Sequence, residues 1–337
     1  MAPFVRDRAE QLACNLCAHL NATRGVSAEV LRVPFSWKCF ERLADEIFLN
    51  RTFQLANVDR MIALKFPAYV IPHHTKILWL LKRYQAFELR NCSESDMTES
   101  SGKEQIRSFI LRSDAKAFLE SRRIFTGSKL IQESLQRYYG FDSEVLMPPL
   151  NNPELFASRG DGGYIYAGGS VNSDTRQHLL VEAMRLTKSA AKLIVAGAPD
   201  TPEAADRLRS AVKRFELEDR VVLDFGFHPV AKIADYVNHA RACAYLPANA
   251  ESVGQVTMEA ALASKPIITL TDSGGILRLV LNGETGCVVV PDSKAIADAI
   301  DSLYCDPTRS QQMGRAARTL WDSFEVTWPK TVEKLLS

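Results

Sequence analysis

Two glutamates, Glu251 and Glu259, flank Gly254 in the stretch Glu-Ser-Val-Gly-Gln-Val-Thr-Met-Glu and are well placed for chemistry. A helix that begins near Gly254 would point unpaired N–H groups and a partial positive charge at an anion such as a diphosphate. An ionised carboxylate only accepts hydrogen bonds, so these two acids suit the hydroxyls of a sugar or a ribose. The same spacing also fits an ordinary amphipathic helix with solvated acids.

A parallel sheet is predicted to position this segment. From residue 163 onward, short apolar runs alternate with stretches of helical periodicity, which is typical of parallel strands with crossover helices. The runs are Tyr164–Ala167, Leu193–Ala196, Val221–Leu223, Ala242–Leu246, Pro266–Leu270 and Cys287–Val290. Ligands of such sheets collect beyond the carboxyl ends of the strands, and Glu251 follows the run that ends at Leu246.

The first half of the chain is less regular. Its strand candidates are Ala28–Val33, Arg60–Leu64, Lys76–Leu81, Ile124–Thr126 and Glu144–Leu146, with helices between them. A chain of 337 residues exceeds what one hydrophobic core supports, so we expect two domains. We predict an N-terminal domain over residues 1–149, a linker over 150–162, a C-terminal domain over 163–318, and a helical segment over 319–337 that packs back toward the N-terminal domain.

Composition excludes some classes of protein. The 41 basic and 40 acidic residues balance, which argues against nucleic acid as a partner. Seven scattered cysteines fit a reducing compartment, and Cys14 and Cys17 are expected to be packed thiols of a helix because no second Cys/His pair completes a metal site. The chain shows no charged-then-apolar leader and no apolar run of about 18 to 20 residues, so we expect a cytoplasmic protein.

The motifs of the second half resemble the C-terminal domain of family four glycosyltransferases, retaining enzymes of the GT-B fold. They are Arg176–Ala183, Leu193–Gly197, the pair Glu251/Glu259 around Gly254, Thr271–Gly275 and Asn282–Gly286. In the first half, Lys65–Tyr69 and Lys76–Leu81 resemble the matching acceptor domain. The resemblance implies an α/β chain of two Rossmann-like domains that face a cleft, with the nucleotide sugar bound by the second domain.

The resemblance also implies roles for individual residues. Glu259 would hold the ribose of the donor and Glu251, as the catalytic-site acid, would contact the sugar. The remaining donor-binding positions would be Ser252, Val253, Gly254, Gly169, Ser170 and Arg176. Neither a metal nor another cofactor is implied. The partners would be a nucleoside-diphosphate sugar and a sugar or lipid-linked acceptor, in polysaccharide or glycolipid synthesis at the inner face of a membrane.

Several positions depart from the family pattern. Ser170 stands where an Arg is usual and Thr175 where a Lys is usual, which leaves Arg176 as the nearest cation for a diphosphate. On the acceptor side, Lys82 and Gln85 replace a usual His and Arg. The preceding pair His73 and His74 would either substitute for that His or form a turn. The chain also opens at Met1-Ala-Pro-Phe, without the strand and glycine-rich turn of its relatives, so we expect an incomplete N-terminal domain.

These departures support an alternative, a catalytically impaired GT-B binding module or a truncated pseudoenzyme. A dinucleotide-dependent oxidoreductase is disfavoured, because Tyr166-Ala-Gly-Gly-Ser170 lacks the G-x-G-x-x-G turn. Two basic clusters, Lys82-Arg83 with Arg90 and Arg122-Arg123, fit either anionic lipid headgroups or solvated helix faces. Peripheral membrane contact therefore stays an open expectation at this point.

Overall fold

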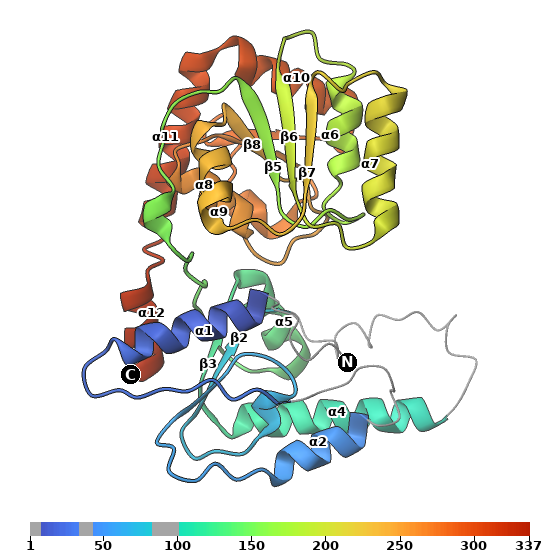
Figure 1. Ribbon diagram of the computed structural model, residues 1–337. Coiled ribbons are helices and arrows are strands. Elements are labelled where there is room, and N and C mark those ends of the chain that lie inside the picture. Colours follow the sequence, from blue (N-terminus) through green and yellow to red (C-terminus); the bar gives the residue numbers. More distant parts are fainter. Residues whose placement is uncertain (1–7, 34–42, 83–100) are drawn as a thin grey trace. The chain divides into compact units, whose positions relative to one another are not determined.

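The chain divides into two compact units in the computed structural model, which describes residues 8–33, 43–82 and 101–337 (Figure 1). Unit 1 consists of residues 1–149 and 326–337, and unit 2 consists of residues 150–325. The segment expected to be a linker, 150–162, therefore belongs to unit 2. The last part of the expected closing segment, from Val326 onward, belongs to unit 1.

Unit 2 is built on one parallel sheet, as the apolar runs predicted. Its strand order is β10-β9-β8-β5-β6-β7, and every pairing between neighbouring strands is parallel. The strands are β5 (Tyr164–Gly168), β6 (Lys192–Gly197), β7 (Val221–Phe225), β8 (Ala242–Ala244), β9 (Ile267–Leu270) and β10 (Gly286–Val289). The central strands β8 and β9 are buried throughout, which explains why they read as continuous apolar runs.

Helices cover both faces of this sheet (Figure 1). Helices α6, α7 and α10 lie together on one face, and α8, α9 and α11 lie together on the other. Their bounds are α6 (Gln177–Met184), α7 (Pro202–Arg214), α8 (Val230–His239), α9 (Gln255–Leu262), α10 (Ser293–Cys305) and α11 (Pro307–Ser323), with a 3-10 helix η5 at Gly274–Arg278. Side-chain caps define several starts: Thr201 caps α7, Asp292 caps α10 and Asp306 caps α11.

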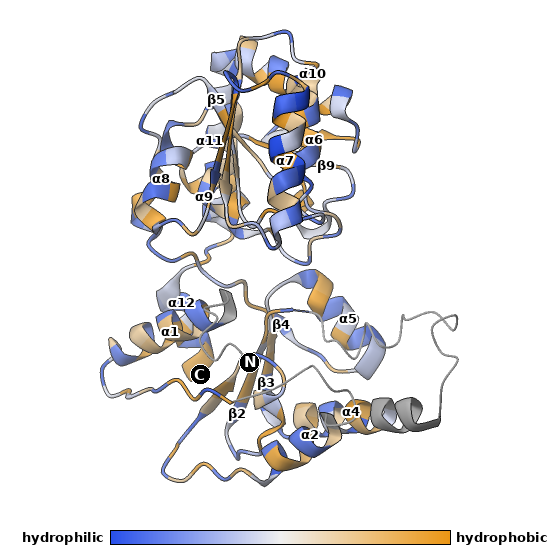
Figure 2. Ribbon diagram, turned by 45° about the vertical axis from the view of Figure 1, so that its right-hand side comes forward, coloured by the Kyte–Doolittle hydropathy of each residue, from blue (hydrophilic) through white to orange (hydrophobic). Residues whose placement is uncertain are grey.

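Unit 1 has a smaller parallel sheet with the order β1-β2-β3-β4. Its strands are β1 (Met61–Ala63), β2 (Lys76–Leu80), β3 (Ser121–Thr126) and β4 (Glu144–Val145). Figure 2 shows that the strands of this sheet are largely hydrophobic. Alternate residues of β2 serve different cores, because successive side chains of a strand point to opposite faces: Ile77 and Trp79 pack into one cluster, and Leu78 and Leu80 pack into the other.

Two helix layers enclose this sheet. Helices α1 (Arg8–Asn21) and α12 (Trp328–Leu336) pack against the Ile77 and Trp79 face, where Leu16 and Val332 belong to the same buried cluster. Helices α2 (Leu43–Thr52), α4 (Ser101–Leu119) and α5 (Lys129–Tyr139), together with the 3-10 helix η2 (Ala68–Val70), supply the cluster on the opposite face. The closing helix of the chain is thus an integral part of the N-terminal unit.

The strand expected at Ala28–Val33 does not form. No described strand pairs with this segment, and the backbone of Ala28 bonds to side chains of α1 instead: Asn21 accepts from its N–H at 2.8 Å and donates to its C=O at 2.9 Å. The Cys17 thiol donates to the same carbonyl at 3.2 Å. Cys14, expected to be packed, is exposed. The incompleteness of the N-terminal domain stays a prediction.

Candidate active site

The predicted donor-site residues of unit 2 lie on loops that leave the carboxyl ends of neighbouring strands. The loops follow β5, β8 and β9, which stand next to one another in the order β9-β8-β5. Parallel strands end at the same edge of a sheet, so residues 169–176, 245–254 and 271–275 gather at one edge. This edge is where an open α/β sheet binds its ligand.

Main-chain hydrogen bonds hold the loop that carries Glu251. The Ala248 N–H donates to the Asp174 carbonyl at 3.0 Å, and the Asn249 N–H donates to the Asp272 carbonyl at 2.8 Å. The Gly275 N–H donates to the Ala250 carbonyl at 2.7 Å. The loop is therefore tied on both sides, to the loop after β5 and to the loop after β9.

The glycine pair after β9 lets this loop approach closely. A Cβ atom at Gly274 would stand 2.5 Å from the Ala250 carbonyl oxygen, and one at Gly275 would stand 3.0 Å from the Glu251 carbonyl oxygen. Gly274 also has φ of 61°, in the left-handed region. The Gly275 N–H is used inside the protein, so the pair serves the packing of the Glu251 loop.

Helix α9 begins at the residue that the sequence indicated. Gly254 is its N-cap with φ of 77°, and a Cβ atom there would stand 2.7 Å from the Tyr245 ring. Ser252 is half-buried, whereas Val253 and Gly254 are buried. The geometry thus brings backbone N–H groups and a helix N-terminus to the ligand edge of the sheet.

The two glutamates differ in burial. Glu259 is 3 % exposed and accepts a hydrogen bond from the Gln255 side chain at 2.8 Å, while Glu251 is half-buried. The alternative of a helix with solvated acids is therefore wrong for Glu259. Burial, together with the charge of Glu259, raises the pKa of the Tyr166 hydroxyl well above its usual value. A buried carboxylate on the second turn of a helix at the ligand edge suits hydroxyl recognition.

The loop after β5 is organised around Ser170. The carbonyl of Ser170 accepts hydrogen bonds from the Thr175 hydroxyl at 2.9 Å and from the Gln177 amide at 2.8 Å. Gly169 has φ of 97°, and its carbonyl oxygen would lie 1.9 Å from a Cβ atom at Gly197. The two positions that lack the usual cations thus build the loop through their own polar groups.

Arg176 lies at the centre of these loops. Its Nη1 and Nη2 atoms donate to the two carboxylate oxygens of Asp272 at 2.8 and 2.7 Å. Nε donates to the Leu246 carbonyl at 2.7 Å and Nη2 to the Pro247 carbonyl at 2.9 Å. A guanidinium has five N–H bonds, and these contacts use four of them. One N–H therefore remains for the predicted contact with a donor phosphate. The hydrogen bonds from Arg176 lower the pKa of Asp272.

The acceptor-side candidates of unit 1 do not come together. His73 and His74 precede β2 and Lys82 follows it, so they lie at opposite ends of a five-residue strand that is roughly 17 Å long. The His73 Nδ1 atom accepts from the Thr75 N–H at 3.1 Å, so Nε2 carries the proton and donates to the Val58 carbonyl at 2.9 Å. His74 is exposed and lies in a turn while His73 is half-buried, which fits the turn alternative, and an acceptor-side role for His73, His74 or Lys82 stays a prediction.

The basic clusters have mixed outcomes. His74 and Lys82 are exposed, whereas Arg83, Gln85 and Arg90 lie outside the described residues. Arg122 is exposed, but Arg123 pairs with Glu144 at 3.1 Å and stacks on the Phe125 ring at 4.8 Å. Contact with lipid headgroups stays a prediction. In the described part of the chain no helix has both the length and the apolar character that crossing a membrane requires.

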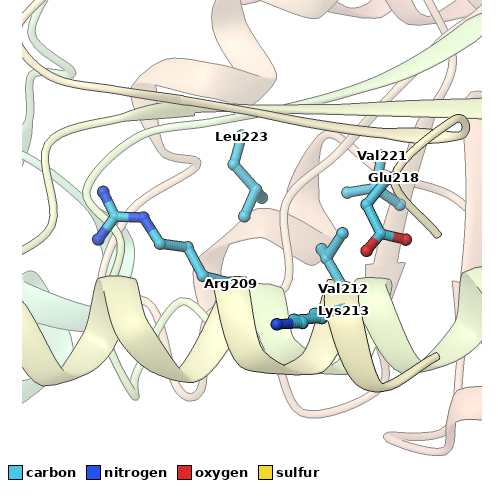
Figure 3. Close-up of a pocket in the computed structure, with 6 residues that line it drawn as sticks. All are labelled: Arg209, Val212, Lys213, Glu218, Val221 and Leu223. Carbon is cyan, nitrogen blue, oxygen red and sulfur yellow. The ribbon is translucent and has the colours of Figure 1, made fainter. Parts of the chain in front are cut away.

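Two features of unit 2 were not found from the sequence. Phe227, just beyond the carboxyl end of β7, is 95 % exposed, the most exposed large hydrophobic side chain among the described residues. A pocket of about 240 Å³ lies between α7 and β7 (Figure 3), and it is lined by Arg209, Val212, Lys213, Glu218, Val221 and Leu223. None of the predicted donor-site residues lines this pocket, so it belongs to a different part of the unit.

Within the described residues no cluster of His, Cys, Asp or Glu is arranged to hold a metal.

Fold and site together define a class: a two-unit α/β protein whose C-terminal unit presents paired acids and a helix N-terminus at the ligand edge of its sheet. The chain has the GT-B fold. Residues 154–320 match the family model "Glycosyl transferases group 1". The match spans nearly all of unit 2, so the C-terminal unit belongs to the glycosyl transferases group 1 family.

Similar proteins agree with this assignment. Over 178 residues the chain is 31 % identical to the alpha-maltose-1-phosphate synthase of Mycolicibacterium smegmatis, an alignment that covers 49 % of this chain and 45 % of that protein. The match to the protein of the same name from Mycobacterium tuberculosis, at 28 % identity, covers 58 % and 54 %. The chain thus spans about half the length of these curated relatives.

Solved structures show the same fold at lower identity. The HepE protein of Anabaena, determined with UDP and glucose, has a TM-score of 0.65 at 16 % identity, covering 87 % of this chain and 80 % of that one. Sucrose-phosphate synthase from Thermosynechococcus elongatus has a TM-score of 0.67 at 18 % identity, covering 92 % and 81 %. Because both alignments extend beyond unit 2, the likeness includes the N-terminal unit.

Proposed function

We propose that this protein transfers a sugar from a nucleoside-diphosphate sugar to an acceptor hydroxyl, with retention of configuration at the sugar. The observation that carries the proposal is the loop from Glu251 to Glu259. It leaves the carboxyl end of β8, presents the N-terminus of α9, and buries Glu259, all within the part of the chain that belongs to the glycosyl transferases group 1 family.

Each part of this loop has a role in the proposed reaction. Glu259 accepts hydrogen bonds from the ribose hydroxyls, and Glu251 accepts them from the donor sugar. The bond from the sugar carbon to the diphosphate oxygen breaks and a bond to the acceptor oxygen forms, while the acceptor proton passes to the diphosphate. N–H groups of Ser252 to Gly254 and of the first turn of α9 stabilise the leaving diphosphate as its charge grows.

Charge in this donor site is reduced relative to the family pattern. Ser170 and Thr175 stand in place of two cations, the Thr175 hydroxyl donates to the Ser170 carbonyl, and Arg176 is paired with Asp272. The proposed reaction therefore depends on amide dipoles for much of its stabilisation of the diphosphate, and we propose that it proceeds without a metal ion. We propose a sugar or a lipid-linked sugar as the acceptor, in polysaccharide or glycolipid synthesis at the cytoplasmic face of a membrane. The names of two relatives, alpha-maltose-1-phosphate synthase and glycogen synthase, support a sugar as the acceptor.

The experiment offers the purified protein UDP-, ADP- and GDP-sugars in turn and measures release of free nucleotide, with and without simple sugars as acceptors. We expect release with at least one donor, and we expect it to persist in the presence of a chelator. If no donor is either bound in calorimetry or turned over, the proposal fails.

The reduced charge favours a second candidate, a nucleotide-binding protein of the same fold that has lost catalysis. This candidate predicts a measurable dissociation constant for a nucleoside diphosphate together with no detectable transfer. The double variant Ser170→Arg/Thr175→Lys separates the two candidates. If the site is impaired but its geometry is intact, the double variant should gain donor affinity and activity, because both cations are restored. Turnover by the unmodified protein at an ordinary rate would exclude the second candidate.

A further inference from the structure

Arg176 adopts a backbone conformation that needs an explanation. It precedes α6 with φ of 51° and ψ of 34°, in the left-handed region. For a residue other than glycine this conformation costs roughly 1 to 2 kcal/mol, so the fold must stabilise it elsewhere. The neighbouring residues anchor the turn: the side chains of Thr175 and Gln177 both bond to the Ser170 carbonyl.

The side chain of Arg176 provides the compensating contacts. Its paired bonds to Asp272 form a bidentate fork, the strongest arrangement available to this pair of residues. The Arg176 side chain is 13 % exposed and the Asp272 side chain 42 % exposed, so the guanidinium is largely shielded from water while the carboxylate is in part open to it. Its other two bonds go to the carbonyls of Leu246 and Pro247, in the loop that leads to Glu251.

These contacts connect three loops through one guanidinium. Arg176 ends the loop after β5, Asp272 lies in the loop after β9, and the two carbonyls belong to the loop after β8. Asp272 reinforces the arrangement from its own backbone, because its carbonyl accepts from the Asn249 N–H at 2.8 Å. The loop that carries Glu251 is thus held by both members of the ion pair.

We propose that Arg176 is a positioning residue. Together with Asp272 it fixes the 246–254 loop, and thereby sets Glu251 and the N-terminus of α9 for the nucleotide sugar, without itself contacting the diphosphate. The proposal rests on the proposed function for the identity of the ligand. Arg176, the cation nearest the predicted diphosphate site, is thereby assigned to the loop and not to the phosphate. Asp272 would by its charge alone repel a phosphate, but here it supports donor binding by holding the loop.

The first test needs no ligand. Hydrogen exchange of the full-length protein, read by mass spectrometry, follows the amides of Ala248 and Asn249, which are hydrogen-bonded to the neighbouring loops. We expect at least a tenfold faster exchange for a peptide covering 246–254 in Arg176→Lys and in Asp272→Asn. Lysine keeps the charge but cannot form the fork, and asparagine keeps the shape but loses the charge-assisted bonds. Unchanged exchange in both variants overturns the proposal.

The second test separates a positioning role from a phosphate contact. Calorimetry measures the affinity of each folded variant for the nucleoside diphosphate that the unmodified protein binds. A positioning pair predicts that Asp272→Asn weakens this affinity by three- to tenfold and Arg176→Lys by about tenfold, with no further loss in the double variant because the two act as one unit. A phosphate-binding Arg176 predicts the opposite for Asp272→Asn, since removing the carboxylate frees the cation and strengthens binding. Unchanged or stronger binding by Asp272→Asn overturns the proposal.

An exposed ion pair in the same unit supplies the matched control. Arg209 and Asp206 pair at 3.0 Å on α7, with side chains 60 % and 70 % exposed. Arg209→Lys and Asp206→Asn should leave both the exchange of the 246–254 peptide and nucleotide affinity within twofold. With a donor that the protein uses, the donor KM should rise in the Arg176 and Asp272 variants while the acceptor KM stays within twofold. A general loss of structure would change both KM values.

The two tests fail independently of the proposed function. If the unmodified protein binds no nucleotide but the 246–254 amides exchange faster in both variants, the ion pair still fixes the loop and the proposed function is what fails. If the unmodified protein binds a nucleotide and neither variant changes its affinity, the positioning role fails and the proposed function stands. Should Arg176→Lys fold poorly, Asp272→Asn still decides between the two outcomes.

Discussion

Each unit contains a carboxylate that accepts hydrogen bonds from buried basic side chains, but the two networks lie at opposite ends of their strands. In unit 1, Glu120 accepts from Arg51 at 2.9 and 2.6 Å and from Lys76 at 3.1 Å. Lys76 is the first residue of β2, at the amino end of the sheet. In unit 2, Asp272 pairs with Arg176 beyond the carboxyl end of β9.

The construction of the two networks is otherwise alike. Lys76 also donates to the carbonyls of Tyr69 and Ile71, just as Arg176 donates to two carbonyls of its neighbouring loop. The same kind of hydrogen-bonded ion pair therefore has a different role at each edge of a sheet. At the amino end it stabilises the unit, and at the carboxyl end it shapes the loops that would bind a ligand. Variants in unit 1 should change stability, and those in unit 2 should change affinity.

The largest effect is expected for Asp114, a buried carboxylate of unit 1 whose side-chain partners among the described residues are two tyrosines. It accepts hydrogen bonds from Tyr69 at 2.6 Å and from Tyr139 at 3.0 Å. Burial raises the pKa of Asp114 to about 7, although both tyrosines act to lower it. The folded state therefore binds the proton more tightly than the unfolded state, and the stability present at low pH is lost as pH rises to about 7.

The free energy of unfolding should fall by up to about 1.4 kcal/mol per pH unit between roughly pH 4 and pH 7, and this dependence on pH should flatten above pH 7. Asp114→Asn removes the titrating group and should remove this slope. Urea unfolding of both proteins at pH 5, 6, 7 and 8 measures the difference. A free-energy difference between them that is constant across these pH values would contradict the buried, proton-binding carboxylate.

The next effect concerns the Glu120 network. Glu120→Gln leaves Lys76, whose side chain is fully buried, without a counter-charge, which should destabilise unit 1 by about 3 kcal/mol. Affinity of unit 2 for a nucleoside diphosphate should stay within twofold. Glu133→Gln is the matched control, because Glu133 forms an exposed pair with Lys129 at 3.9 Å that should contribute less than about 0.5 kcal/mol. Equal losses in the two variants would remove the contrast between the units.

The sequence predicted unit 2 better than unit 1 for a physical reason. Strands buried on both faces must be continuously apolar, so β5, β8 and β9 could be read directly. The pattern of Ala28–Val33 also suits a strand, but a strand exists only when another pairs with it. Side chains of α1 take the backbone groups of Ala28 instead, and this could not be read from the segment itself.

The candidate site was predictable to the same extent. The β8–α9 segment could be placed, because Gly254 and the apolar run that precedes it mark a strand, a turn and a helix in order. The pairing of Arg176 with Asp272 could not, since it joins residues far apart in the sequence through a left-handed backbone at a position that is not glycine.

A smaller effect is expected when Glu259 loses its charge. Glu259→Gln keeps the size of the side chain but weakens hydrogen bonds to ribose hydroxyls, at about 2 kcal/mol or roughly thirtyfold in the dissociation constant. Calorimetry with a nucleoside diphosphate measures this loss. Glu218→Gln, an exposed residue of the same unit, should leave affinity unchanged. If Glu259→Gln binds as tightly as the unmodified protein, the ribose assignment is wrong even though the fold stands.

The smallest predicted effect is at Phe227, which tests how far the ligand edge extends along the sheet. Its ring is exposed beyond β7, and the following His228 bonds to the Asp224 carbonyl at 2.9 Å, which fixes the turn. An exposed aromatic ring on such a turn suits stacking with a nucleotide base, worth about 1 kcal/mol. Phe227→Ala should weaken nucleotide binding about fivefold and Phe227→Trp should retain it.

Thermal stability separates this role from packing. An exposed ring contributes little to the core, so the melting temperature of Phe227→Ala should match that of the unmodified protein, whereas the buried networks of unit 1 change stability and leave affinity alone. Val222→Ala is the control, because Val222 is 50 % exposed within β7, the strand that precedes Phe227. If Phe227→Ala and Val222→Ala both bind the nucleotide as tightly as the unmodified protein, the ligand edge is confined to the loops after β5, β8 and β9. The contrast between the two units would then rest on Asp272 and Glu259 alone.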